Sequence, residues 1–83
     1  MENVDINVLF FGSLKSIYGN QMNLSIPRGL QLTAFIAKLK EMSPEATGLL
    51  DSCRIAVNCE LKNDDFAIDK SYELAVLPPY SGG

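Results

Sequence analysis

Four stretches of the chain alternate apolar and polar residues. Between the second and the third of them lies a longer stretch whose apolar residues recur with a helical period. The alternating stretches are residues 4–11, 21–26, 54–58 and 72–77. A period of two places apolar side chains on one face of a strand, whereas spacings of three and four place them on one face of a helix. This order constrains the chain to a sheet with one face packed against a helix.

The helical stretch follows Pro27-Arg28-Gly29, which ends the second strand. Its apolar residues recur at helical spacing: Leu32, Phe35, Ile36, Leu39 and Met42. Thr33 has the chemistry of an N-cap, but the apolar stripe begins before it, so the start of this helix stays open. Ser43 is expected to cap a short second helix with Pro44 at its first position.

After the third alternating stretch, Asn58-Cys59 is expected to turn the chain into a short strand over residues 60–62. Phe66 and Ile68 are expected to plug the core beneath a loop. The resulting order is strand, strand, helix, strand, short strand, strand. It predicts an α+β domain with the β-grasp, or ubiquitin-like, fold, in which one main helix covers one face of a mixed sheet. The expected core comprises Ile6, Val8, Phe10, Leu24, Ile26, Phe35, Ile36, Leu39, Ile55, Val57, Leu74 and Val76.

Composition excludes several functions for this single 83-residue domain. Without His, the chain has no imidazole to act as a general base or metal ligand. Two Cys are too few for a zinc site or an iron–sulfur cluster. Seven basic and ten acidic residues give a net charge of −3 without a basic cluster, which disfavours nucleic-acid binding. We expect a carrier or subunit that is not catalytic alone and holds no metal or cofactor.

The N-terminal residues are acidic, and no apolar run approaches the ~18 residues of a membrane span, so we expect a cytoplasmic protein without membrane contact. Cys53 and Cys59 would lie roughly 20 Å apart in an extended strand, too far for a disulfide. They are therefore expected to be free thiols in or near the core.

The far face of the predicted sheet carries a second apolar set. Leu9 and Phe11 share one parity of the first strand, Ala75 and Leu77 share the matching parity of the last, and Leu61 is expected near them. One interpretation is that loops or a bulge cover these residues. The other is that they form a protein-docking surface, since clustered exposed apolar residues mark interaction sites.

The domain is expected to span residues 1–77, and residues 78–83 are expected to form a flexible tail ending in Gly82-Gly83. A proline pair stiffens the start of such a tail. Glycines lack Cβ atoms, so they can pass through a narrow channel and present an unhindered carboxylate. That carboxylate becomes an acyl donor only after another enzyme activates it with ATP. The alternative is a frayed, dispensable tail.

The ending Leu-Pro-Pro-Tyr-Ser-Gly-Gly resembles the tail of the molybdopterin synthase small subunits, the MoaD-like sulfur carriers. Residues 8–11, 56–58 and 73–79 also match that family's pattern. The resemblance implies that Gly83 is adenylated by a MoeB-like, ubiquitin-activating-like adenylyltransferase and becomes a thiocarboxylate. It further implies that Gly82 and Ser81 thread a channel in a MoaE-like large subunit, within a heterotetramer, where sulfur passes to cyclic pyranopterin monophosphate. Phe11, Leu61 and Leu77 would dock both partners.

Tyr80 departs from the family pattern, which has a small aliphatic residue after the prolines. Three other interpretations stay open. The chain could be a related carrier that supplies sulfur for thiazole, tRNA or cysteine synthesis. It could be a protein modifier that forms isopeptide bonds through Gly83, or a plain β-grasp binding module with an inert tail.

Overall fold

A computed structural model describes residues 2–79 of the chain. Its strands are β1 (Asn3–Phe10), β2 (Gln21–Pro27), β3 (Leu30–Gln31), β4 (Arg54–Val57), β5 (Glu60–Lys62), β6 (Ala67–Ile68) and β7 (Glu73–Leu77). Its helices are α1 (Lys15–Tyr18), α2 (Leu32–Met42) and α3 (Thr47–Asp51), with single 3₁₀ turns at Gly12–Leu14 and Pro44–Ala46. None of these helices is long and apolar enough to cross a membrane, within the described part of the chain.

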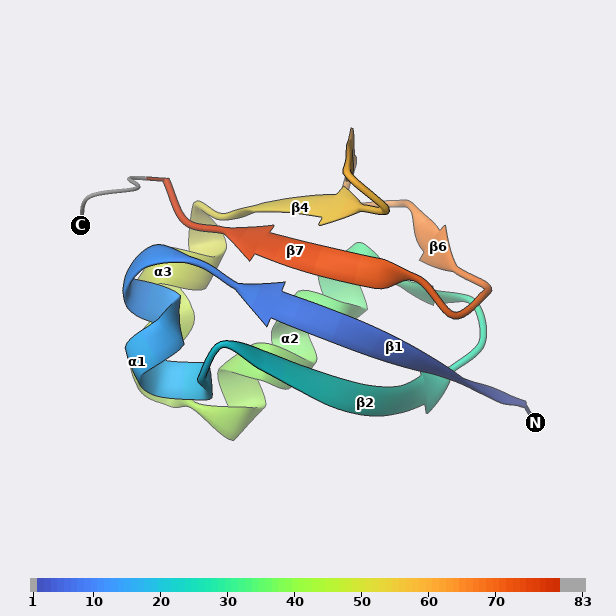
Figure 1. The fold of residues 1–83 in the computed structure, drawn as a ribbon, viewed down its shortest axis with the longest axis horizontal. Coiled ribbons are helices and arrows are strands. Elements are labelled where there is room, and N and C mark those ends of the chain that lie inside the picture. The colour runs from blue at the N-terminus through green and yellow to red at the C-terminus, as the bar shows by residue number, and fades with distance from the viewer. Residues whose placement is uncertain (1, 80–83) are drawn as a thin grey trace.

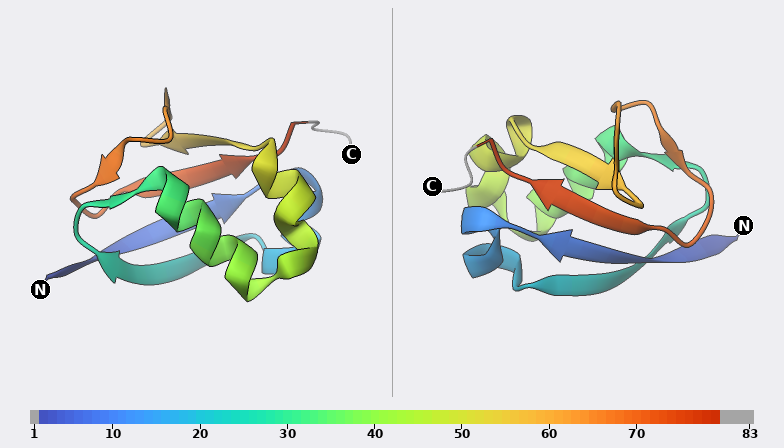
Figure 2. Two further views of the ribbon diagram at one scale, coloured as in Figure 1. Left: turned by 180° about the vertical axis from the view of Figure 1, so that it is seen from behind. Right: turned by 45° about the horizontal axis from the view of Figure 1, so that its top comes forward.

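The main sheet has the strand order β2-β1-β7-β4-β5. β1 runs parallel to β7, and the remaining neighbours are antiparallel. The helices α2 and α3 lie behind this sheet in Figure 1, α1 lies at the end where β1 stops, and the views in Figure 2 show the same two layers. The predicted hairpin, crossing helix and mixed sheet are confirmed, and the arrangement is that of a β-grasp fold.

The core lies between the sheet and the helices, because only one face of the sheet is covered. Every second residue of β1 and of β7 is buried there, as the period-two pattern predicts. On α2, Leu32, Phe35 and Leu39 are buried completely. Leu24 and Ile36 were expected in the core, and they are only half-buried at its border. Met42 ends the apolar stripe of α2 but exposes 51% of its surface, because the helix stops there.

The connection between β1 and β2 forms a 3₁₀ turn followed by α1. Leu14 is fully buried in this segment. The hydroxyl of Tyr18 donates a hydrogen bond to the Leu39 carbonyl at 2.6 Å, and its ring stacks on Phe10 with centroids 4.7 Å apart. The segment therefore closes one end of the core.

The start of α2 needs no side-chain cap. The helix begins after Gln31, and the backbone N–H groups of Leu32 and Thr33 donate to the carbonyls of Phe66 and Asp64. Distant backbone thus satisfies donors that a cap residue would otherwise bind. Ile68 is fully buried, and it pairs with Leu30 in a two-stranded sheet that was not expected.

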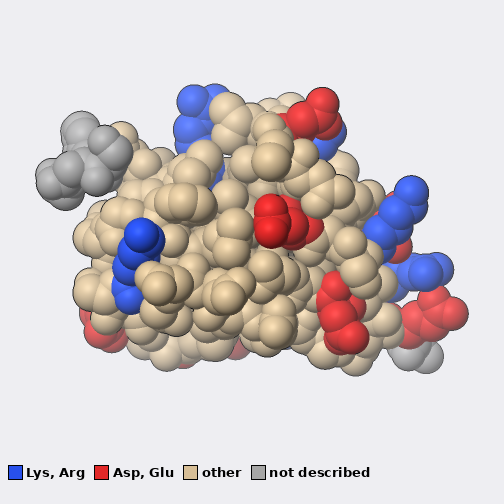
Figure 3. All heavy atoms as spheres, viewed as in Figure 1, with Lys and Arg blue, Asp and Glu red and all other residues tan. Residues whose placement is uncertain are grey.

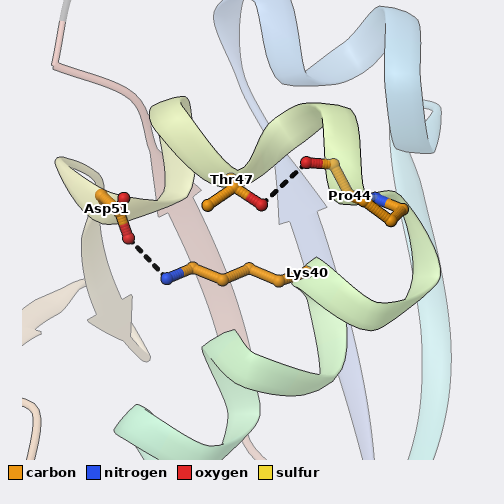
Figure 4. Close-up of polar contacts among 4 residues, drawn as sticks. All are labelled: Lys40, Pro44, Thr47 and Asp51. Carbon is orange, nitrogen blue, oxygen red and sulfur yellow. Dashed lines mark hydrogen bonds and ion pairs between the residues drawn. The ribbon is translucent and has the colours of Figure 1, made fainter.

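The second helical segment begins at Pro44, as predicted, but the expected side-chain cap by Ser43 is wrong. The hydroxyl of Thr47 instead donates to the Pro44 carbonyl at 2.7 Å. Figure 4 shows this bond beside an ion pair between Lys40 of α2 and Asp51 of α3. The ion pair joins the two helices at the solvent side, whereas the Thr47 hydrogen bond lies within the second helical segment.

Candidate docking face and tail root

The uncovered face of the sheet carries an apolar row that crosses four strands. Leu9 on β1 is the register partner of Ala75 on β7, and Ala75 is the partner of Ala56 on β4. Ala56 is in turn the partner of Leu61 on β5. Directly opposed residues share one face of a sheet, so these four side chains form one continuous band. Sequence reasoning missed Ala56, although its place between Ile55 and Val57 assigns it to the opposite parity.

Phe11 and Leu77 extend this band toward one end of the sheet. Phe11 follows the last residue of β1 and keeps an extended backbone, with φ −130° and ψ 160°, so it continues the parity of Leu9. Leu77 is the last residue of β7 and pairs with Arg54. Phe11 exposes 39% of its surface and Leu61 exposes 51%, whereas large apolar side chains are usually buried. We name the six residues the apolar sheet face: Leu9, Phe11, Ala56, Leu61, Ala75 and Leu77.

The other half of the same face is polar. Asn7 on β1 pairs with Asn23 on β2 and with Glu73 on β7. A shallow hollow of about 680 Å³ lies here, with Asp5 and Tyr72 also in its wall. Figure 3 shows this face of the molecule with few charged side chains, which are widely separated. The face is therefore divided into an apolar half beside the end of β7 and a polar half beside its start.

The chain leaves the sheet at the apolar half. Leu77 ends β7, and Pro78 and Pro79 follow without backbone N–H groups, so neither can donate to a sheet ladder. The predicted tail residues Tyr80, Ser81, Gly82 and Gly83 lie outside the described residues, and the predicted flexibility of the tail stays a prediction. The structure thus places Phe11 and Leu77 at the end of the sheet where the tail begins.

The turn between β4 and β5 positions Leu61. Asn58 and Cys59 both adopt left-handed backbone conformations, with φ of 49° and 72°. Consecutive residues of this kind make the tight turn whose twist matches a two-stranded hairpin. Cys59 is exposed in this turn, which corrects its expected place near the core.

Cys53 packs against the core, and both cysteines are free thiols. Burial, aided by the charge of Asp64, raises the pKa of Cys53 to about 11. Its thiol is therefore protonated and unreactive at neutral pH. Among residues 2–79, no three Cys, Asp or Glu side chains lie together as ligands for a metal ion.

Comparison with known proteins agrees with this geometry. Residues 8–83 match the model of the ThiS family. The molybdopterin synthase sulfur carrier subunit of Dictyostelium discoideum is 32% identical over 92% of this chain and 93% of that protein.

Two solved structures share the fold over nearly their whole length. One is a chain of the complex of subunits 1 and 2 of the molybdopterin-converting factor from Helicobacter pylori, with 28% identity and a TM-score of 0.65 over 96% of this chain and 100% of that one. The other is Haloferax volcanii small archaeal modifier protein 1, with 17% identity and a TM-score of 0.77 over 93% of this chain and 99% of that one. The match to the family model extends from residue 8 to residue 83, so it includes the tail. The chain therefore belongs to the ThiS family, as a relative of the molybdopterin synthase sulfur carrier subunits.

Proposed function

We propose that this protein is the sulfur carrier subunit of a molybdopterin synthase. The observation that carries the proposal is that the apolar sheet face and the start of the tail lie at one end of the sheet. We name the residues from which the tail starts, Leu77, Pro78 and Pro79, the tail root. Leu77 belongs to both, since it ends β7 and lies beside Arg54 at the border of the face. A partner that covers this face would therefore receive the tail directly.

The apolar sheet face suits a protein partner. Phe11 and Leu61 expose a large part of their surface at its two sides, and the small side chains of Ala56 and Ala75 leave the middle of the band flat. Aromatic and leucine side chains around a flat centre bury well against a complementary surface. The similarity to a chain of the Helicobacter pylori complex of subunits 1 and 2 supports a large synthase subunit as this partner.

The proposed chemistry resides in the last residue of the sequence. The carboxylate of Gly83 attacks the α-phosphate of ATP on an adenylyltransferase, releasing pyrophosphate and forming an acyl adenylate. Hydrosulfide from a sulfur source then displaces AMP and leaves a thiocarboxylate. In the large subunit the thiocarboxylate sulfur displaces an oxygen substituent from a carbon of cyclic pyranopterin monophosphate, and water hydrolyses the resulting thioester, which leaves the sulfur on the substrate and returns the Gly83 carboxylate. No side-chain acid, base or metal ligand of this chain is required, which agrees with the absence of His from its sequence.

Intact mass measurement tests the first half of this proposal. The chain is incubated with its adenylyltransferase, ATP and a sulfur source. We expect a mass increase equal to the replacement of one oxygen by sulfur. Deletion of Gly83 should abolish the increase. The Cys53→Ala/Cys59→Ala variant should retain it, since the sulfur is expected at the C-terminus. A cysteine persulfide would differ in mass, because it adds a sulfur atom without losing an oxygen. An unchanged mass with an active adenylyltransferase would contradict a carrier role.

The second half is tested by adding the large subunit and cyclic pyranopterin monophosphate to the thiocarboxylated chain. We expect the thiocarboxylate to return to the carboxylate as molybdopterin forms. A thiocarboxylate that forms but does not react here would instead favour a carrier for thiazole, tRNA or cysteine synthesis. Attachment of Gly83 to protein lysines would favour a modifier.

A further inference from the structure

β2 forms an outer edge of the main sheet, and β1 is its only neighbour there among the described residues. It lies along the lower border of the sheet in Figure 1, opposite the border formed by β4 and β5. A strand at such an edge has backbone N–H and C=O groups that point out of the sheet. The residues that carry these outward groups follow from the register.

Two hydrogen bonds fix which residues of β2 face β1. The N–H of Phe10 donates to the Asn20 carbonyl at 3.0 Å, and the N–H of Arg28 donates to the Glu2 carbonyl at 2.9 Å. These bonds flank the register that pairs residues 3–9 with residues 21–27. Bonded and non-bonded pairs alternate in an antiparallel ladder, so the even-numbered residues of β2 bond to β1.

The odd-numbered residues Gln21, Asn23 and Ser25 therefore direct their backbone groups outward. Proteins usually protect such an edge with charged side chains, proline or a bulge. Residues 21–26 contain no charged residue, and only Pro27 at the end of the strand lacks an N–H group. The seven pairs with β1 follow one another without a bulge. The edge is thus straight, neutral and open to a further strand.

The side chains of this edge are complementary to themselves. In an antiparallel pair centred on Asn23, Gln21 lies opposite Ser25 of the second copy, and Met22 lies opposite Leu24 of the second copy. Met22 and Leu24 are half-buried on the helix side, where they border the core. In this register each would cover the exposed part of the other across the two-fold axis, which adds apolar contact to the backbone hydrogen bonds.

We propose that β2 pairs with β2 of a second copy of this chain, antiparallel and centred on Asn23. The two sheets then continue into one another, edge to edge. Both apolar sheet faces and both tail roots stay uncovered, so the dimer is compatible with partner docking. The proposal depends on the edge alone, not on sulfur transfer.

Sedimentation equilibrium of the full chain tests this dimer. Up to about 1 mM protein, a range that detects even weak association, we expect the average mass to rise from 9.1 kDa toward twice that value. Asn23→Pro removes an outward N–H group and should therefore abolish the rise in mass. The variant should still fold, since edge positions tolerate proline. Asn23→Ala keeps the N–H group and is the matched control, which should dimerise like the parent chain. Circular dichroism verifies that each variant is folded.

Charge pairs test the register without proline. Gln21→Lys with Ser25→Lys places like charges opposite each other across the axis and should raise the dimer Kd about tenfold. Gln21→Lys with Ser25→Glu places opposite charges there and should restore association. A monomeric mass at all concentrations would overturn the proposal, and so would a dimer that neither Asn23→Pro nor the double-Lys variant weakens.

Discussion

Asn58 and Glu73 exchange two hydrogen bonds. The N–H of Asn58 donates to the Glu73 carbonyl at 2.8 Å, and the N–H of Glu73 donates to Asn58 Oδ1 at 3.0 Å. Asn58 lies in the turn between β4 and β5, and Glu73 is the first residue of β7. The pair therefore fixes the hairpin that carries Leu61 to the strand that leads into the tail.

Asn58→Ala should lower the free energy of unfolding by about 1–2 kcal/mol. The substitution removes a side-chain acceptor and places alanine in a left-handed conformation that asparagine tolerates better. Urea unfolding measures the change. Asn63→Ala, at another exposed asparagine, is the control and should alter stability by less than about 0.5 kcal/mol. Equal stability of the parent chain and Asn58→Ala would show that the pair does not hold the hairpin.

Leu61→Asp should weaken binding to the large synthase subunit at least about tenfold while the chain stays folded, because a carboxylate replaces an apolar contact. Met42→Asp is a matched control, since Met42 is equally exposed at 51% but lies at the end of α2, in the helix layer. Isothermal titration calorimetry compares the two variants. Equal losses would place the contact away from the apolar sheet face. Phe11→Asp and Leu77→Asp should behave like Leu61→Asp.

Leu14→Ala should cost about 2–5 kcal/mol of folding stability, because its side chain is fully buried in the core. Ser13→Ala changes the neighbouring exposed residue and should be close to neutral. Thermal unfolding distinguishes the two variants. A small effect of Leu14→Ala would mean that residues 12–18 contribute little to the core.

Folding stability should decline between about pH 9 and pH 11 through Cys53. In the unfolded chain the thiol loses its proton near its ordinary pKa of 9.0, whereas burial holds the folded pKa at about 11. The stabilisation is complete below pH 9 and is lost as the pH rises through this window.

Cys53→Ala removes this titration, so the pH dependence of urea unfolding should be shallower in that variant. Cys59→Ala changes an exposed thiol and should follow the parent curve. Parallel curves for the parent chain and Cys53→Ala would contradict the burial of this thiol.

The apolar periodicities determined much of the fold. Strand parity on β1, β4 and β7 follows from adjacent residues, and a period of two leaves only one choice once one face is buried. The same parity identified Leu9, Phe11, Ala75 and Leu77 on the uncovered face, before any contact was known. The order of strands and helix then allowed one compact sheet, which the structure confirms.

Contacts between distant segments decided the rest. Residues 12–18 close one end of the core, where Leu14 is buried and the Tyr18 hydroxyl reaches the Leu39 carbonyl. The helix α2 begins at Leu32, where the carbonyls of Phe66 and Asp64 accept hydrogen bonds from its first two N–H groups. Neither contact has a local signal in the sequence. The joining of Leu61 to Leu9 through two alanines also required the register of four strands, since small residues reveal nothing of their neighbours by themselves. Local patterns fix which way a side chain points, whereas only tertiary packing fixes what it meets.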